Sequence, residues 1–217
     1  MRVDFRHPFA VVTPTLDGDV LTRLAQAEAA FTPGQLQRIL PGRSTEGIRK
    51  TLQRLTVQGV VDAEFVGKGA QYRLNRDHLV AEHIIAIANQ RTTLLRRLTD
   101  VLQGWVVPPV YGAVFGSTAR GDARSDSDID IFLVRPDDAA PEPWEDCVGD
   151  LSRSVTRWTG NDTRALHMSE AEVRSGAGTD PVLTSIVDEG LTVCGHPLWL
   201  RQLVRPTRRN RGTHDPV

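Results

Sequence analysis

The chain is poor in cysteine and has no long apolar run. Its 217 residues include two cysteines, Cys147 and Cys194, which form no Cys-x-x-Cys pair, and its six histidines do not pair at metal spacing. So few thiols exclude a disulfide scaffold and predict a reducing compartment, the cytoplasm. No stretch approaches the ~20 apolar residues that cross a bilayer. The residues after Met1 lack the apolar core of a secretory signal, and we therefore expect no membrane partner.

The formal net charge of −1 hides a segregation of charge along the chain. Residues 1–76 carry eleven Lys and Arg against seven Asp and Glu, whereas residues 105–200 carry seven against sixteen. Residues 201–217 are basic again, with five arginines and one aspartate. A basic segment attracts nucleic acid and an acidic one repels it. The segregation therefore predicts two domains with different partners.

A cluster of candidate functional residues follows an apolar, strand-like run that ends at Phe115. Gly116-Ser117 comes next, and a polar loop separates it from Asp128 and Asp130. The two aspartates are two residues apart in a second strand-like run, so both carboxylates should project from one face. Carboxylates this close repel each other unless a cation lies between them. Mg²⁺ suits that place because it binds oxygen ligands, usually one or two carboxylates plus substrate phosphates.

The Gly116-Ser117 pair supplies the other half of the predicted site. Glycine lets the backbone turn sharply and approach a ligand, and exposed N–H groups with a hydroxyl can hold phosphate oxygens. The alternative is a surface turn followed by an edge strand with exposed aspartates. The order of the two halves, one loop apart and each beside an apolar strand, favours a site for a nucleoside triphosphate and its metal.

These residues resemble the minimal form of the nucleotidyltransferase superfamily typified by DNA polymerase β. Its pattern is a hydrophobic residue, Gly-Ser, a loop, and then Asp-hydrophobic-Asp-hydrophobic. The resemblance implies a small mixed sheet flanked by helices, dependence on Mg²⁺ or Mn²⁺, and transfer of a nucleoside monophosphate from a triphosphate to an acceptor. It assigns catalysis and metal binding to Asp128 and Asp130. It assigns nucleotide binding to Gly116, Ser117, Arg120 and Ser127.

The family normally supplies a third carboxylate from a later strand, here expected over residues 163–168. Asp162 stands at the start of that strand and is the candidate for a third catalytic residue. It could equally be a turn residue, because Gly-Asn-Asp is ordinary turn chemistry. Further along, Arg164 and His167 occupy positions where an acidic residue could be expected. Without a third carboxylate, nucleotide binding could survive where catalysis does not.

The caps and apolar spacing of the N-terminal part predict three helices followed by a hairpin. Asp19 can cap a first helix through Ala30, and Thr32 followed by Pro33 starts a second. Ser44 opens a third helix, which Gly59 closes. Two strand-like runs follow around a glycine-rich tip, at residues 60–66 and 70–74. The buried stripe of the third helix should comprise Ile48, Leu52, Leu55 and Val57.

This arrangement resembles a winged helix–turn–helix domain and implies double-stranded DNA as a partner. The third helix would be the recognition helix. Lys50 and Lys68, the chain's two lysines, would lie on that helix and at the wing tip. The alternative is a module for protein interaction or dimerisation, since fold alone does not fix function. The predicted DNA-contacting residues are Thr45, Arg49, Lys50, Gln53 and Lys68.

Together these patterns predict an α+β protein. Its predicted parts are a winged helix–turn–helix domain at residues 1–78, a linker helix at 79–104, a nucleotidyltransferase domain at 105–204 and a basic, disordered tail at 205–217. The linker is either one long helix or two in series. We expect its apolar stripe to pack on the sheet, and it could also pair with a second copy in a homodimer.

Two functions follow from the resemblance. The first is a nucleotidyltransferase that is targeted or autoregulated by its winged helix. Minimal enzymes of this kind are often antitoxins that modify a partner toxin, so the acceptor can be such a protein. The alternative is a DNA-binding transcriptional regulator whose degenerate transferase domain senses nucleotide.

Overall fold

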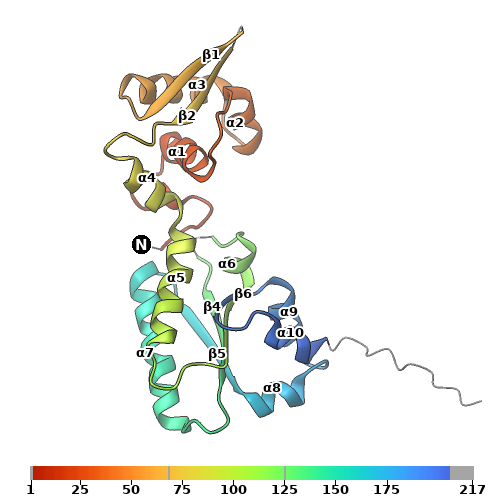
Figure 1. Cartoon of the computed structure of the whole chain (residues 1–217). Coiled ribbons are helices and arrows are strands. Elements are labelled where there is room, and N and C mark those ends of the chain that lie inside the picture. Colours follow the sequence, from red (N-terminus) through yellow and green to blue (C-terminus); the bar gives the residue numbers. More distant parts are fainter. Residues whose placement is uncertain (1, 68, 125, 206–217) are drawn as a thin grey trace, which may run out of the picture. The chain divides into compact units, whose positions relative to one another are not determined.

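The computed structural model describes residues 2–67, 69–124 and 126–205, and these form two compact units (Figure 1). The first unit comprises the chain up to Leu95 together with Gly121–Ser127 and Thr159–Asn161. The second comprises Arg96–Arg120, Asp128–Trp158 and the chain from Asp162 onward. Mixed helices and small sheets confirm the predicted α+β class. In the described part of the chain, no helix is long and apolar enough to cross a membrane. The predicted tail lies, from residue 206 onward, outside the described residues.

The first unit contains three helices followed by an antiparallel hairpin, the order predicted for a winged helix–turn–helix. A short 3₁₀ helix precedes them. Apolar side chains from all of these elements form one buried core, with Leu24, Leu36, Ile48 and Leu52 at its centre. The elements are a 3₁₀ helix (Pro8–Val11), α1 (Leu16–Gln26), α2 (Pro33–Ile39), α3 (Thr45–Val57), β1 (Val61–Val66) and β2 (Gly69–Leu74).

The starts of α2 and α3 are confirmed by their caps. The Thr32 hydroxyl accepts a hydrogen bond from the Gln35 N–H, and the Gln35 side chain accepts one from the Thr32 N–H. This reciprocal capping box satisfies two backbone donors that the helix leaves unpaired. The Ser44 hydroxyl caps α3 by accepting from the Gly47 N–H. The buried stripe of α3 is confirmed except at Val57, which is 90% exposed because a residue two positions after Leu55 does not lie on the same helix face.

The predicted capping role of Asp19 is wrong. Helix α1 begins three residues earlier, at Leu16, and ends at Gln26 rather than Ala30. Asp19 therefore lies inside the helix, where its side chain is only 9% exposed. A carboxylate in this position must find donors elsewhere, because burying an unpaired charge is costly.

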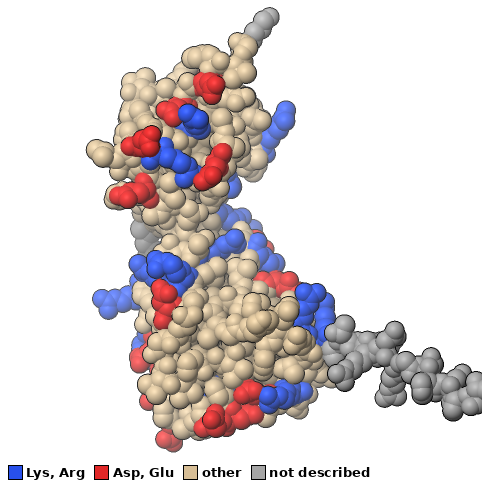
Figure 2. Space-filling view, in the orientation of Figure 1, with Lys and Arg blue, Asp and Glu red and all other residues tan. Residues whose placement is uncertain are grey.

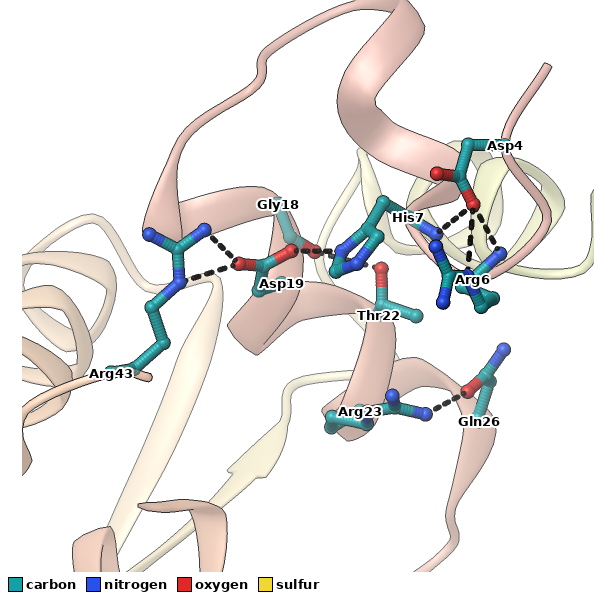
Figure 3. A network of polar contacts seen from close by, with 9 residues as sticks. All are labelled: Asp4, Arg6, His7, Gly18, Asp19, Thr22, Arg23, Gln26 and Arg43. Atoms are coloured by element: carbon teal, nitrogen blue, oxygen red, sulfur yellow. Dashed lines mark hydrogen bonds and ion pairs between the residues drawn. The ribbon is translucent and has the colours of Figure 1, made fainter. Parts of the chain in front are cut away.

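The donors for Asp19 come from two other segments (Figure 3). His7, just before the 3₁₀ helix, places Nδ1 3.0 Å from Asp19 Oδ1. Arg43, in the turn between α2 and α3, donates from Nε at 3.0 Å and from Nη2 at 2.6 Å to Asp19 Oδ2. The carboxylate thus ties the N-terminal segment and the α2–α3 turn to α1.

Two helices in series follow the hairpin, which decides between the alternatives left open for the linker. They are α4 (Ala81–Ala88) and α5 (Gln90–Gln103), separated at Asn89. Leu94, Leu98 and Leu102 of α5 are buried.

The second unit is built on a four-stranded mixed sheet with the order β5-β4-β3-β6. Strand β3 runs antiparallel to β4 and β6, whereas β4 and β5 are parallel and joined through the long helix α7. The elements are β3 (Tyr111–Phe115), α6 (Gly116–Arg120), β4 (Ile129–Arg135), α7 (Pro141–Thr159), β5 (Thr163–Ser169), α8 (Glu170–Gly176), α9 (Pro181–Glu189), β6 (Leu191–Gly195) and α10 (Leu198–Val204).

Helices cover both faces of this sheet (Figure 1). Phe132 and Val134 of β4 pack with apolar residues of α8, α9 and α10. On the other face, a Cβ at Gly112 would lie 3.2 Å from Leu133 and 3.5 Å from Leu102 of α5. On this side, Trp105, two residues after the end of α5, meets Trp144 of α7 edge to face with ring centroids 5.3 Å apart.

We expect Asp19→Ala to destabilise the first unit by about 1–3 kcal/mol, because it removes the hydrogen bonds that a mostly buried carboxylate accepts from Arg43 and His7. Asp62→Ala is the matched control, since it removes the acceptor of an exposed pair with Arg73 that is worth about 1 kcal/mol at most. Amide hydrogen exchange in α1 and α3 measures both effects. Equal losses of protection in the two variants would contradict a structural role for Asp19.

Candidate active site

Strand β4 positions the two predicted metal-binding aspartates. Asp128 immediately precedes the strand and Asp130 is its second residue, and both are half-buried. Ile129 and Ile131, which alternate with them, are fully buried on the opposite face. The buried isoleucines therefore fix the direction in which the carboxylates point.

The Gly116 turn lies directly against Asp130. Gly116 follows β3 and begins α6, and its φ of +68° is in the left-handed region that favours glycine. A Cβ at this position would lie 2.7 Å from Asp130 Oδ2. Glycine is thus required here by the backbone conformation and by the carboxylate that occupies the adjacent space. Ser117 is half-buried in the first turn of α6.

The electrostatics of Asp130 favour a bound cation. Burial raises the pKa of Asp130, and the charge of Asp128 raises it further, whereas Arg164 and Arg120 oppose this shift. A divalent ion between the two carboxylates would relieve both effects. The oxygen donors fit Mg²⁺ or Mn²⁺ that completes its coordination with substrate phosphates.

Among the described residues, no third carboxylate lies beside the aspartate pair in a metal-binding cluster. Within the described ranges, no three His, Cys, Asp or Glu side chains gather closely enough to hold a metal ion. Asp162 is exposed at the start of β5, and its carbonyl accepts a hydrogen bond from the Ile129 N–H. The side chain beside the pair is Arg164, whose Nη2 lies 2.8 Å from Asp128 Oδ2.

Glu189, at the end of α9, is a residue of this site that the sequence did not indicate. Its carboxylate accepts from the Gly116 N–H at 3.2 Å, from Arg120 Nη1 at 2.7 Å and from the Ser185 hydroxyl at 3.0 Å. The Arg120 hydrogen bond is the largest of the contacts that lower the pKa of Glu189. The Glu189 carboxylate therefore already occupies one donor of the Gly-Ser turn, the Gly116 N–H, together with Arg120. More than seventy positions separate Glu189 from Gly116, so local spacing carries no signal for this contact.

Ser127 belongs to the first unit, whereas the residues just described belong to the second. Its hydroxyl accepts a hydrogen bond from the Arg124 N–H at 2.9 Å and closes the polar loop. This contact gives Ser127 a local structural role. Its predicted contact with nucleotide stays a prediction.

Four of the five predicted DNA-contacting residues lie on α3, where Arg49, Lys50 and Gln53 are exposed and Thr45 is half-buried. Glu46 pairs with Arg49 at 2.8 Å and with Lys50 at 3.9 Å. Acidic and basic side chains are also interspersed on the face of the molecule in Figure 2. The charges of Arg49 and Lys50 are therefore partly neutralised by Glu46 of the same helix. Lys68 lies outside the described residues.

The mixed sheet, with an aspartate pair on one strand beside a Gly-Ser turn, is the arrangement that the sequence pattern predicted. Residues 108–165 match the family model described as "Nucleotidyltransferase domain". The match includes the Gly-Ser turn, both aspartates and Arg164. No curated protein matches the chain.

Several solved structures resemble parts of the chain at low sequence identity. One, a toxin–antitoxin complex with AMP-PNP, is 16% identical, with a TM-score of 0.38 over 51% of this chain and 80% of that one. A second is the Shewanella oneidensis tri-AMPylated HEPN toxin with MNT antitoxin, 14% identical, with a TM-score of 0.36 over 52% and 80%. The archaeal chromatin protein TrmBL2 is 15% identical, with a TM-score of 0.26 over 80% and 72%. Similarities at this level carry no argument about function.

We expect Gly116→Ala to destabilise the second unit more than Gly178→Ala does. Both glycines have left-handed φ, so both changes incur strain of about 1–2 kcal/mol. Gly178 has open space around it, whereas a methyl group on Gly116 also collides with Asp130, which adds about 1–3 kcal/mol. Tryptophan fluorescence during urea unfolding reports on this unit, because Trp105, Trp144, Trp158 and Trp199 all lie in it. Equal costs would show that the contact with Asp130 is unimportant.

Proposed function

We propose that the protein is a Mg²⁺-dependent nucleotidyltransferase that moves a nucleoside monophosphate from a triphosphate to an acceptor. The observation that carries this proposal is the Asp128–Asp130 pair, held by β4 against the Gly116 turn within the matched domain. Mn²⁺ can serve in place of Mg²⁺, because both ions bind carboxylate oxygens.

Each residue of the site has a defined task in this proposal. Asp128 and Asp130 hold the metal, which when bound neutralises phosphate charge and aligns the reacting groups. The Ser117 hydroxyl and backbone N–H bind a phosphate oxygen, and Gly116 permits its close approach. Arg120, at the end of α6, offers a planar guanidinium for a second phosphate contact.

The proposed acceptor is a protein partner, such as a toxin, as the resemblance to minimal nucleotidyltransferases implies. Incubation of the protein with Mg²⁺ and each α-labelled nucleoside triphosphate tests the activity. Label transferred to a lysate protein or to the chain itself supports the proposal and identifies the nucleotide. Its loss on chelation of the metal would establish the metal dependence.

The second candidate function is a DNA-binding regulator that binds nucleotide without turning it over. One observation favours it: Arg164, rather than a carboxylate, lies beside Asp128. Tight binding of triphosphate without any transfer in the labelling experiment would select this function.

Under either function, we propose that the winged unit binds double-stranded DNA through α3. Exposed Arg49, Lys50 and Gln53 are types of residue that contact phosphates and base edges. Because Glu46 pairs with both cations, phosphate contacts must replace two existing ion pairs. We therefore expect binding that is modest and strongly dependent on salt.

Asp128→Asn combined with Asp130→Asn should reduce Mg²⁺-dependent transfer by about a hundredfold or more, because it removes the metal ligands while keeping side-chain size. DNA binding should persist. Asp150→Asn, at an exposed pair on α7, is the control and should retain full activity. Undiminished transfer in the double variant would refute the assignment. Asp162→Asn decides whether Asp162 is the third ligand: a comparable loss would assign it that role, and retained transfer would remove it.

Arg49→Ala combined with Lys50→Ala should weaken binding to a DNA duplex of mixed sequence. The slope of log affinity against log salt should fall by about one for each phosphate that the protein no longer neutralises. Stability should barely change, because both side chains are exposed. Arg153→Ala on α7 is the matched control. Fluorescence anisotropy at several salt concentrations measures the effect, and unaltered affinity in the double variant would exclude α3 as the recognition helix.

A further inference from the structure

Arg164 reaches the metal carboxylates by the register of the sheet. In the parallel pairing of β4 and β5, Arg164 is the partner of Asp130, so both side chains leave the same face. The guanidinium extends to Asp128, where Nη2 lies 2.8 Å from Oδ2. The Arg164 side chain is 76% exposed and that of Asp128 only 23%. An exposed guanidinium, that of Arg164, thus pairs with the largely buried carboxylate of Asp128.

The phosphate-facing side of the site is paired in the same manner. Arg120 contacts Glu189, which also holds the Gly116 N–H. Arg164 therefore pairs with the predicted metal ligand Asp128. Glu189 likewise pairs with Gly116 and Arg120, which are predicted to bind nucleotide. Both contacts engage groups that a metal ion and a triphosphate would also use, so they compete with the binding of those ligands.

We propose that Arg164 is an internal counter-ion that occupies Asp128 and makes the binding of metal and triphosphate cooperative. This role rests on the proposed function and assigns to Arg164 the coupling between metal binding and triphosphate binding. A metal ion that binds alone competes with Arg164 for the negative charge of Asp128 and weakens the ion pair of the guanidinium. A triphosphate that enters with the metal supplies oxygens to which the guanidinium can donate two hydrogen bonds. By linkage, each ligand then raises the affinity of the other by the same factor.

Arg164 acts through Asp128 and is a positioning residue, so its test is metal affinity in the absence of nucleotide. Arg164→Gln should bind Mn²⁺ about fivefold more tightly than the unaltered protein, the factor expected for loss of a partly exposed ion pair. Arg164→Lys keeps the charge and should bind Mn²⁺ like the unaltered protein. A merely structural role for Arg164 predicts no gain in affinity in either variant.

Titration calorimetry on the full chain gives these affinities, with Arg153→Gln as control, since it removes an exposed arginine from an ion pair on α7. A non-hydrolysable triphosphate should strengthen Mn²⁺ binding in the unaltered protein and about fivefold less so in Arg164→Gln. Mn²⁺ affinity that is unchanged or lower in Arg164→Gln overturns the proposal. Equal affinities of the Gln and Lys variants, or no Mn²⁺ binding by any variant, overturn it as well. Arg164→Ala repeats the test should the Gln variant fail to fold.

The metal titrations are independent of catalysis. Absence of transfer together with the gain in Mn²⁺ affinity would refute the enzymatic function and leave Arg164 as the counter-ion. Transfer without that gain would refute the role of Arg164 and leave the enzymatic function standing.

Discussion

The repulsion between two carboxylates on one face of β4 is the interaction to which the rest of the site responds. Because Ile129 and Ile131 are buried on the other face, Asp128 and Asp130 cannot turn away from each other. Burial and mutual charge raise the pKa of Asp130. The surrounding chain compensates with Arg164, and it leaves no Cβ at Gly116, where one would meet the Asp130 carboxylate. The burial of Ile129 and Ile131 thus keeps two negative charges on one face of the strand.

Local signals predicted much of this structure, because they act over a few residues. Thr32 and Ser44 were each predicted to start a helix, and the structure has a helix start at both. The alternation in Ile129-Asp130-Ile131 likewise predicted which side chains of β4 would be buried. The capping role of Asp19 was predicted wrongly because Asp is a common capping residue. Only its tertiary partners Arg43 and His7 explain why a carboxylate lies inside α1.

Contacts between distant segments were beyond the reach of such signals. Glu189 reads as the last residue of an ordinary short helix, and only the packing of α9 near α6 brings it to Gly116. Arg164 occupies a position where the sequence pattern could place an acidic residue. Its contact with Asp128 could not be predicted, because it depends on the parallel register of β4 and β5. Helix α7, the longest of the second unit, was not predicted from its sequence, although its buried Trp144, Val148, Leu151 and Val155 recur at helical spacing.

The parallel pairing of β4 and β5 has a consequence for how the second unit folds. Parallel strands cannot be joined by a tight turn, and here the chain passes through all of α7 before it returns to the sheet. Pairings between segments distant in sequence form slowly, because the entropy of closing the intervening loop is lost before contacts compensate for it. The antiparallel β3–β4 pair involves a shorter connection and can bring Gly116 to Asp130 before β5 docks. During synthesis from the N-terminus, the aspartate pair therefore emerges well before Arg164, and the nascent β4 carries its two charges without their guanidinium partner.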